Sequence, residues 1–275
     1  MNQRLRRRPR GVTVKSPEQV RLMRQAGLVV AEALERMSEA VRPGVTTGEL
    51  DRIARAVLDE HGATSNFLHY GHPPFPAVIC ASVGAEVVHG IPGERVLEEG
   101  ELCSIDFGAV VAGWHGDAAV TVPVGQCAPE VLELNRVTED SLWAALAVVR
   151  VGGSLSDVGA AVESVVRPHG YGVLEDYTGH GIGRAMHEPP SVPNVAPQGP
   201  GRGMALDAGI VLAVEPMVTL GSAETVLLDD DWTVATADGH QASHWEHTVA
   251  VTPDGPWVLT ARDGGSARLG SVSGW

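Results

Sequence analysis

Apolar residues recur at helical spacing in two stretches near the start of the chain. Ser16-Pro17-Glu18-Gln19 is typical of a capping box with proline at the first helical position, and it predicts a helix from there to about Val41. A second helix is predicted to begin at Thr46-Thr47-Gly48-Glu49 and to end near Gly62. The apolar faces of the two helices carry Met23, Gly27, Val30, Leu34, Met37 and Val41, and Leu50, Ile53, Val57 and Leu58.

The period then changes to that of strands, which are predicted at 77–83, 101–111 and 118–124. The same order returns in the second half, with helices at 129–152 and 154–170 and strands at 210–218, 225–228, 232–236 and 246–251. Arg42-Pro43-Gly44 with His61-Gly62 matches Arg150-Val151-Gly152 with His169-Gly170 at the same internal spacing. Two related halves in one α+β body are therefore predicted, with central strands, outer helices and a site in the cleft between the halves.

Five ionisable residues lie in apolar or glycine-rich stretches rather than on solvated helix faces: Asp106, Asp117, His180, Glu215 and Glu246. Four carboxylates and an imidazole are costly to bury unless a cation lies among them. Oxygen donors with one histidine suit divalent first-row metals, and shared carboxylates suit two ions side by side. The alternative is five separate surface or salt-bridged residues. The flanking sequence favours the shared site, so the chain is predicted to be a dinuclear metallohydrolase.

The local sequence predicts how these residues are presented. A hairpin turn at 110–113 would place Asp106 and Asp117 on one face of adjacent strands, with Ile105 and Phe107 on the opposite face. Pro216 favours an extended backbone at Glu215, at the end of a strand. The run 179–183 lacks the full dinucleotide-binding pattern, so its glycines are expected to let the backbone approach the metal and to orient the histidine.

Composition narrows the class further. The chain has 275 residues, 44% of them hydrophobic, and a formal charge of −14, which argues against a nucleic-acid-binding body. No apolar run reaches bilayer length, the start lacks the features of a secretory signal, and the three cysteines are expected to be reduced thiols in a cytoplasmic protein.

The two ends of the chain differ from its body in composition. Arginines in residues 1–13 predict a basic, disordered arm that is either solvated or in contact with a polyanion such as ribosomal RNA. Residues 14–260 are expected to form the catalytic domain, and residues 261–275, rich in Gly and Ser, a flexible tail.

A series of motifs resembles the type I methionine aminopeptidases of the pita-bread metallopeptidase family, over about Val14 to Thr260. The matching motifs are Val88-His89-Gly90-Ile91-Pro92, Asp106 with Trp114-His115-Gly116-Asp117, Gly179-His180-Gly181-Ile182-Gly183 with His187-Glu188-Pro189, Val214-Glu215-Pro216-Met217, and Glu246-His247-Thr248-Val249. The resemblance implies the pita-bread fold, an α+β body of two pseudo-symmetric halves with a curved antiparallel sheet and outer helices. It also implies removal of the initiator methionine from nascent chains whose second residue is small. The protein is expected to be a monomer with no membrane partner.

The resemblance further implies a role for each site residue. Asp106 would bind one of two divalent ions (Mn, Fe, Co or Zn), His180 and Glu215 the other, while Asp117 and Glu246 would bridge both and a shared water would act as hydroxide. His89 and His187 would bind the scissile amide and stabilise the oxyanion, and Glu215 would also shuttle a proton. Candidates for the methionine pocket are Phe75, Cys80, Met186 and Trp232, with ordinary core packing as the alternative. Met186 departs from the family, in which many members carry an aromatic residue.

Three other classes of protein remain as alternatives. An Xaa-Pro aminopeptidase of the same fold usually carries a large additional N-terminal domain. A non-catalytic ribosome-associated relative would lack metal ligands, whereas all five are present in this chain. A phosphoesterase with two metals has no support beyond the metals themselves.

Overall fold

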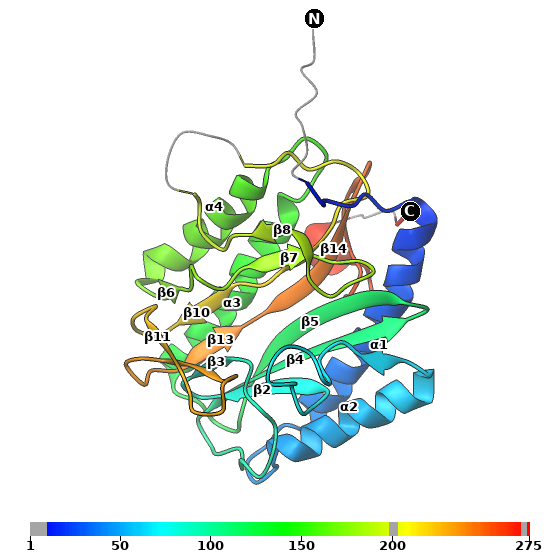
Figure 1. Cartoon of the computed structure of the whole chain (residues 1–275). Coiled ribbons are helices and arrows are strands. Elements are labelled where there is room, and N and C mark those ends of the chain that lie inside the picture. The colour runs from blue at the N-terminus through cyan, green and yellow to red at the C-terminus, as the bar shows by residue number, and fades with distance from the viewer. Residues whose placement is uncertain (1–9, 198–202, 271–273) are drawn as a thin grey trace, which may run out of the picture.

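The computed structural model describes residues 10–197, 203–270 and 274–275. Most of the predicted basic arm lies outside these residues. Strands lie at the centre, with one pair of helices behind them at the upper left and the other pair at the right and lower right, as Figure 1 shows. The helices are α1 (Pro17–Ala40), α2 (Thr47–His61), α3 (Pro129–Ala147), α4 (Leu155–Val166), the 3-10 helix η1 (Arg167–His169) and α5 (Ser266–Leu269).

The main sheet has nine strands in the order β1-β4-β5-β14-β9-β7-β8, with β2 paired to β4 and β15 to β14. Two three-stranded sheets, β13-β10-β6 and β11-β12-β3, adjoin it. All of the strand pairs are antiparallel. The strands are β1 (Thr64–Ser65), β2 (Ile79–Val83), β3 (Glu86–Val88), β4 (Leu102–Val111), β5 (Trp114–Pro123), β6 (Gly172–Val173), β7 (Gly179–Gly181), β8 (Glu188–Val192), β9 (Val211–Val214), β10 (Met217–Thr219), β11 (Thr225–Leu227), β12 (Val234–Thr236), β13 (Ala242–His244), β14 (Glu246–Thr252) and β15 (Gly255–Val258).

The predicted helix starts are confirmed by their caps. Capping boxes precede α1 at Ser16, α2 at Thr46 and α4 at Ser154, each with a glutamine or acidic residue three positions later that accepts from the cap amide. The helix expected from 129 to 152 ends earlier, at Ala147, and the last turn of the helix expected to reach Gly170 is 3-10. Local hydrogen bonds between residues three apart therefore begin the helices where the sequence indicated.

Each half has its own apolar core. In the first half α1 and α2 pack on β2, β4 and β5, with Ile105 and Phe107 fully buried between them. In the second half α3 and α4 pack on β9, β14 and β15. The two halves also share a detail, because the cap residues Thr46 and Ser154 form equivalent antiparallel bridges to Val96 and Ala205. The predicted relation between the halves is therefore present in the structure, and the main sheet is continuous across them.

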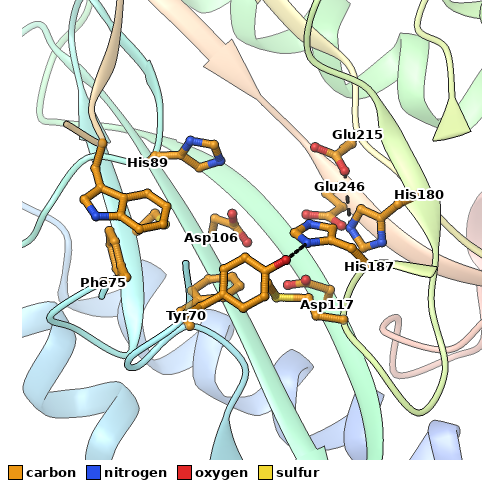
Figure 2. A pocket seen from close by; sticks show the side chains of 13 residues that line it. Tyr70, Phe75, His89, Asp106, Asp117, His180, His187, Glu215 and Glu246 are labelled. Carbon is orange, nitrogen blue, oxygen red and sulfur yellow. Dashed lines mark hydrogen bonds and ion pairs between the residues drawn. The ribbon is translucent and has the colours of Figure 1, made fainter. Parts of the chain in front are cut away.

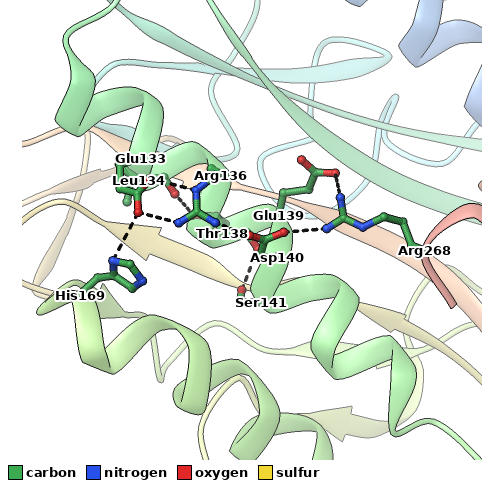
Figure 3. A network of polar contacts seen from close by, with 9 residues as sticks. All are labelled: Glu133, Leu134, Arg136, Thr138, Glu139, Asp140, Ser141, His169 and Arg268. Carbon is green, nitrogen blue, oxygen red and sulfur yellow. Dashed lines mark hydrogen bonds and ion pairs between the residues drawn. The ribbon is translucent and has the colours of Figure 1, made fainter.

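Residues 261–270 lie against the body. The Arg268 guanidinium in α5 forms ion pairs with Glu139 (3.3 Å) and Asp140 (2.7 Å) of α3, as Figure 3 shows. Arg24 of α1 donates hydrogen bonds to the carbonyls of Leu259 and Ala261. One contact thus comes from Arg268 within the Gly- and Ser-rich stretch and the other from Arg24 of α1. The domain boundaries at 13 and 260 stay predictions. None of the helices in the described part of the chain is long and apolar enough to cross a membrane.

Candidate metal site and pocket

The hairpin of β4 and β5 places two of the predicted metal ligands on one face of the main sheet. Asp106 is opposite Ala119, and Asp117 is opposite Gly108, so both aspartates project from the same side of the two strands. The hairpin turn is the two-residue Ala112-Gly113, both with positive φ (50° and 75°), as expected for a tight hairpin. Ile105 and Phe107 face the helices, so the predicted division of the two faces is confirmed.

Strand register brings the other three ligands to the same face. Glu246 of β14 is also opposite Ala119, and His180 of β7 is opposite Ala213 of β9. Glu215 follows Ala213 by two residues, and Pro216 separates β9 from β10, so Glu215 lies at a strand end as predicted. Figure 2 shows the five side chains gathered around one pocket.

The chain leaves the main sheet at two neighbouring points, next to the two glutamates. Glu215-Pro216 separates β9 in the main sheet from β10 in a small sheet, and Trp245 separates β13 from β14 in the same way. Because β10 pairs with β13 and β9 with β14, both strands bend together. The buried Asn194 stabilises this bend by donating hydrogen bonds to the carbonyls of Tyr177 and Glu215, each at 3.1 Å.

The electrostatics of this cluster fit a bound cation. Asp117, His180 and Glu246 are buried and each offers a ligand atom within 4.8 Å of the others. Among the described residues, Asp106 Oδ1, Asp117 Oδ1 and Glu246 Oε1 have no hydrogen-bond partner. Burial, and then the neighbouring carboxylates, raise the pKa of Asp106, Glu215 and Glu246 well above their usual range, and burial raises the pKa of Asp117 to about 7. A divalent cation would satisfy these oxygens and offset their repulsion.

The protonation state and orientation of His180 suit a metal ligand. Burial, and then the nearby His187, lower the pKa of His180 to about 3, so its ring is neutral at physiological pH. Nδ1 lies 2.9 Å from the carbonyl of Gly181 and Nε2 lies 3.5 Å from Glu215 Oε1. When Nδ1 carries the proton and donates to that carbonyl, the Nε2 lone pair faces the carboxylates, which is the arrangement that metal-binding histidines need.

The glycines beside His180 have a packing role that the sequence did not indicate. His180 lies in the strand β7. A Cβ at Gly179 would lie 2.4 Å from the carbonyl oxygen of Ala213, and a Cβ at Gly181 would lie 2.3 Å from that of Pro189. These glycines therefore allow close approach of the neighbouring strands β9 and β8. That they also let the backbone approach a metal stays a prediction.

A cavity of about 120 Å³ lies beside the carboxylates. All four predicted pocket residues line it, namely Phe75, Cys80, Met186 and Trp232. The rings of Phe75 and Trp232 meet edge to face, with centroids 5.1 Å apart. Burial and the nearby carboxylates raise the pKa of the Cys80 thiol well above its usual range, so Cys80 contributes an apolar surface and no nucleophile. A space of this size is below the ~300–1,000 Å³ of pockets for drug-sized ligands and suits one side chain.

His89 and His187 line the same pocket. His89 has a positive φ of 61°, an uncommon conformation for a residue other than glycine and one found at functional positions. Burial lowers its pKa to about 4, and the pKa of His187 is lowered by the same cause. Both imidazoles are thus neutral at physiological pH and able to donate one hydrogen bond each.

Three further side chains belong to the site and were not predicted. The Tyr70 hydroxyl is 2.6 Å from His187 Nδ1, and Phe67 lines the pocket. His244 is buried, its Nε2 has no hydrogen-bond partner among the described residues, and it lies 4.0 Å from Glu215 Oε2. The position of His244, two residues before Glu246 in a β-like stretch, was the only signal for it. The prediction of Phe75 as a pocket residue indicated that the loop bearing Phe67 and Tyr70 lies near the site, but no signal identified these two residues themselves.

The fold and the carboxylate–histidine cluster together define a metallopeptidase. Residues 21–253 match the model of metallopeptidase family M24, and the chain belongs to this family. It is 50% identical over 258 residues to methionine aminopeptidase 1 of Mycobacterium tuberculosis, with 91% of this chain and 96% of that protein covered.

Solved structures agree with this assignment. A methionine aminopeptidase from Rickettsia prowazekii has a TM-score of 0.87 and 37% identity, covering 91% of this chain and all of that one. An Xaa-Pro dipeptidase from Bacillus anthracis shares the fold, with a TM-score of 0.72 and 23% identity, and this chain covers 90% of its own length but 61% of that chain. The predicted pita-bread fold and family are therefore confirmed.

Proposed function

We propose that the chain is a methionine aminopeptidase that removes the first methionine from polypeptides whose second residue is small. The observation that carries the proposal is the meeting of five metal-ligand side chains, two neutral histidines and an apolar cavity in one pocket. The similarity to methionine aminopeptidases over nine-tenths of the chain supports the choice of substrate.

We further propose that two divalent ions bind at this site. Asp106, Asp117, Glu215 and Glu246 carry four negative charges when ionised, which two divalent ions balance. With His180 the donor set is mainly oxygen, and it suits Mn, Fe, Co or Zn. When bound, such ions would polarise the scissile carbonyl and acidify a water molecule. Elemental analysis of protein purified without added metal tests both the number of bound ions and their identity.

The roles of the two histidines follow from their surroundings. When Tyr70 donates its hydroxyl hydrogen to Nδ1 of His187, the proton of His187 is on Nε2, which is then the donor available to a peptide oxygen. The ring of His89 is held edge to face against Tyr177 (6.2 Å) and Trp232 (6.1 Å). We assign both histidines to binding the scissile amide and stabilising its oxyanion, and Glu215 to accepting and returning a proton.

The pocket supports methionine as the preferred first residue. Its lining combines aromatic rings with the flexible side chain of Met186 and the thiol of Cys80, which suits an unbranched thioether. Gly71 has a positive φ of 72°, and a Cβ there would lie 2.4 Å from the Trp232 ring. The 68–75 loop therefore packs directly on Trp232, and we propose that the narrow space excludes a bulky second residue.

Tripeptide hydrolysis tests this specificity. We expect Met-Ala-Ser to be cleaved with a kcat/KM at least about ten-fold above that of Leu-Ala-Ser, because a misplaced methylene in an apolar pocket costs about 1–3 kcal/mol. Met-Leu-Ser should be cleaved slowly, and a chelator should stop all cleavage. Rapid cleavage of Met-Leu-Ser, or preference for Ala-Pro-Ser, would move the chain to another peptidase class.

The basic arm leads to a separate prediction. Arg4, Arg6, Arg7, Arg8 and Arg10 precede an acidic body, and we propose that they contact ribosomal RNA near emerging nascent chains. Deleting residues 2–10 should leave Met-Ala-Ser hydrolysis unchanged and weaken co-sedimentation with ribosomes at low salt. A full-length variant with glutamine at the five arginines separates charge from length. Equal co-sedimentation of all three proteins would leave the arm without this role.

A further inference from the structure

A short segment before α1, Thr13–Lys15, lies against the turn that carries two of the pocket residues. Lys15 Nζ donates hydrogen bonds to Glu188 Oε2 (2.8 Å) and to Thr13 Oγ1 (2.6 Å). Thr13 Oγ1 donates to the same Glu188 oxygen at 2.6 Å. The backbone amide of Lys15 donates to the carbonyl of Gly209 at 2.8 Å, so a backbone contact also anchors the segment to the second half. We call Thr13–Lys15 the N-terminal strap.

Glu188 passes this contact on to the turn 183–188. Its other oxygen, Oε1, accepts hydrogen bonds from the amides of Arg184 (2.7 Å) and Ala185 (3.3 Å). One carboxylate therefore holds the strap on one side and the turn on the other. Met186 and His187 lie in the chain between these two amides and Glu188. Their backbone positions therefore depend on the hydrogen bonds that link Glu188 to Arg184 and Ala185.

The Lys15–Glu188 ion pair is nearly buried, so neither side chain can exchange its partner for water without cost. The Lys15 side chain is 4% exposed and that of Glu188 11%. Burial lowers the pKa of Lys15, and Glu188 partly offsets that effect. Burial would raise the pKa of Glu188, but hydrogen bonds from Lys15 and Thr13 outweigh it and hold that pKa at about 2. Removing one partner leaves the other charge desolvated and less well paired.

The packing around the pair leaves little room for another arrangement. A Cβ at Gly183 would lie 2.6 Å from both Lys15 Cε and Glu188 Oε1. The far end of the turn is also tied, because the amide of His115 in β5 donates to the carbonyl of Gly183 at 2.9 Å. The guanidinium of Arg184 lies over the Trp114 ring at 4.4 Å. The turn is thus fixed at one end by β5 and at the other by the strap.

We propose that Lys15 is a positioning residue: through Glu188 it fixes the turn that presents Met186 and His187 to the pocket. Lys15 does not line the pocket, so it acts through another residue. The role of His187 in catalysis rests on the proposed function. The proposal that Lys15 fixes the turn 183–188 does not.

The experiment compares Lys15→Met, Glu188→Gln and the double variant with the unchanged protein. Arg36→Met is the control, because it breaks an ion pair within α1, with Glu32, and one between α1 and α2, with Glu60. None of these three residues lines the pocket. Thr13→Val is a milder variant that removes one hydrogen bond to Glu188. It tests the same contact if Lys15→Met does not fold. Two measurements are made: amide hydrogen exchange of peptides covering 183–189 and 102–123 in metal-free protein, and kcat and KM for Met-Ala-Ser.

We expect Lys15→Met to speed exchange in 183–189 by about ten-fold or more and to leave 102–123 nearly unchanged. kcat should fall by about ten-fold with KM within about three-fold, since a displaced His187 is missed mainly in the transition state. The double variant should lose no more than either single one, because both act through one contact.

Three results would overturn the proposal. Faster exchange in both peptides would indicate a general stability effect, and unchanged kcat with a loosened turn would remove the positioning role. Losses that multiply in the double variant would show that Lys15 does not act through Glu188. If the unchanged protein releases no methionine, the proposed function fails, while the exchange data still test whether Lys15 holds the turn.

Discussion

Replacing Asp117 by Asn should abolish methionine release and metal binding and, at pH 8, raise the melting temperature of the metal-free protein. Asp117 is buried on the sheet face between the other ligands, and Asn keeps its shape while removing its charge. In the proposed two-ion site, loss of one of the four carboxylates leaves too little negative charge to balance two divalent ions. The same loss relieves repulsion when no ion is present, so function and stability should change in opposite directions.

The sign of the pH effect follows from the pKa shifts. Burial raises the pKa of Asp117 from 3.8 to about 7, and the pKa values of Asp106, Glu215 and Glu246 are raised as well. Between pH 3.8 and about 7 the unfolded chain has lost the Asp117 proton while the metal-free folded protein keeps it. Stability therefore falls as pH rises through this interval, and it stays low above it. Below pH 3.8 both states are protonated and the penalty from Asp117 disappears.

Thermal unfolding in a chelator, at pH 4 and pH 8, measures this effect. We expect Asp117→Asn to gain about 3 °C or more at pH 8, the shift that ~1 kcal/mol produces in a domain of this size, and to gain little at pH 4. Asp59→Asn, at an exposed position on α2, is the control and should change neither value. Metal content by calorimetry or elemental analysis completes the test. An Asp117→Asn protein that retains two ions and full activity would contradict the two-ion site.

Local signals predicted the parts of the fold that depend on nearby residues. The caps at Ser16, Thr46 and Ser154 and the hairpin around Ala112-Gly113 involve residues a few positions apart, and all were recognisable from residue type and spacing. The short strands β6, β7 and β13 were not predicted, whereas β11 and β12, with three residues each, lie within the predicted strands 225–228 and 232–236. A run of three or fewer residues carries too little periodicity to be recognised reliably. Their pairing is decided by strands that come from the other parts of the chain.

The same division applies to the site. Asp106 and Asp117 were placed on one face from the hairpin alone, while their proximity to His180 needs β14 and β9 between the two halves. The motif resemblance supplied that long-range information. It did not supply Tyr70 or His244, which reach the site through a loop and a small sheet that the sequence pattern leaves undefined. In the structure His244 is marked by its buried Nε2, which has no hydrogen-bond partner among the described residues, and Tyr70 by its contact with His187.

Alanine at His89 or at His187 should lower kcat for Met-Ala-Ser by roughly 10²-fold and leave the metal content unchanged. The two imidazoles line the pocket with the carboxylates but are neutral, and their N–H groups are suited to an oxygen that gains negative charge in the transition state. A donor that acts mainly in the transition state affects kcat more than KM.

Tyr70→Phe separates the donor role of His187 from a ligand role. It removes the hydroxyl that lies 2.6 Å from His187 Nδ1 and leaves the ring in place. If that hydroxyl keeps the proton of His187 on Nε2, kcat should fall by about ten-fold, less than in His187→Ala. The reason is that in Tyr70→Phe part of the protein carries the His187 proton on Nδ1, and Nε2 then cannot donate. His240→Ala, an exposed histidine paired with Asp238, is the control and should keep full activity.

Two results for His89→Ala or His187→Ala would contradict the donor role. Loss of a metal ion would identify the replaced residue as a ligand. An unchanged kcat would show that other groups of the pocket stabilise the oxyanion.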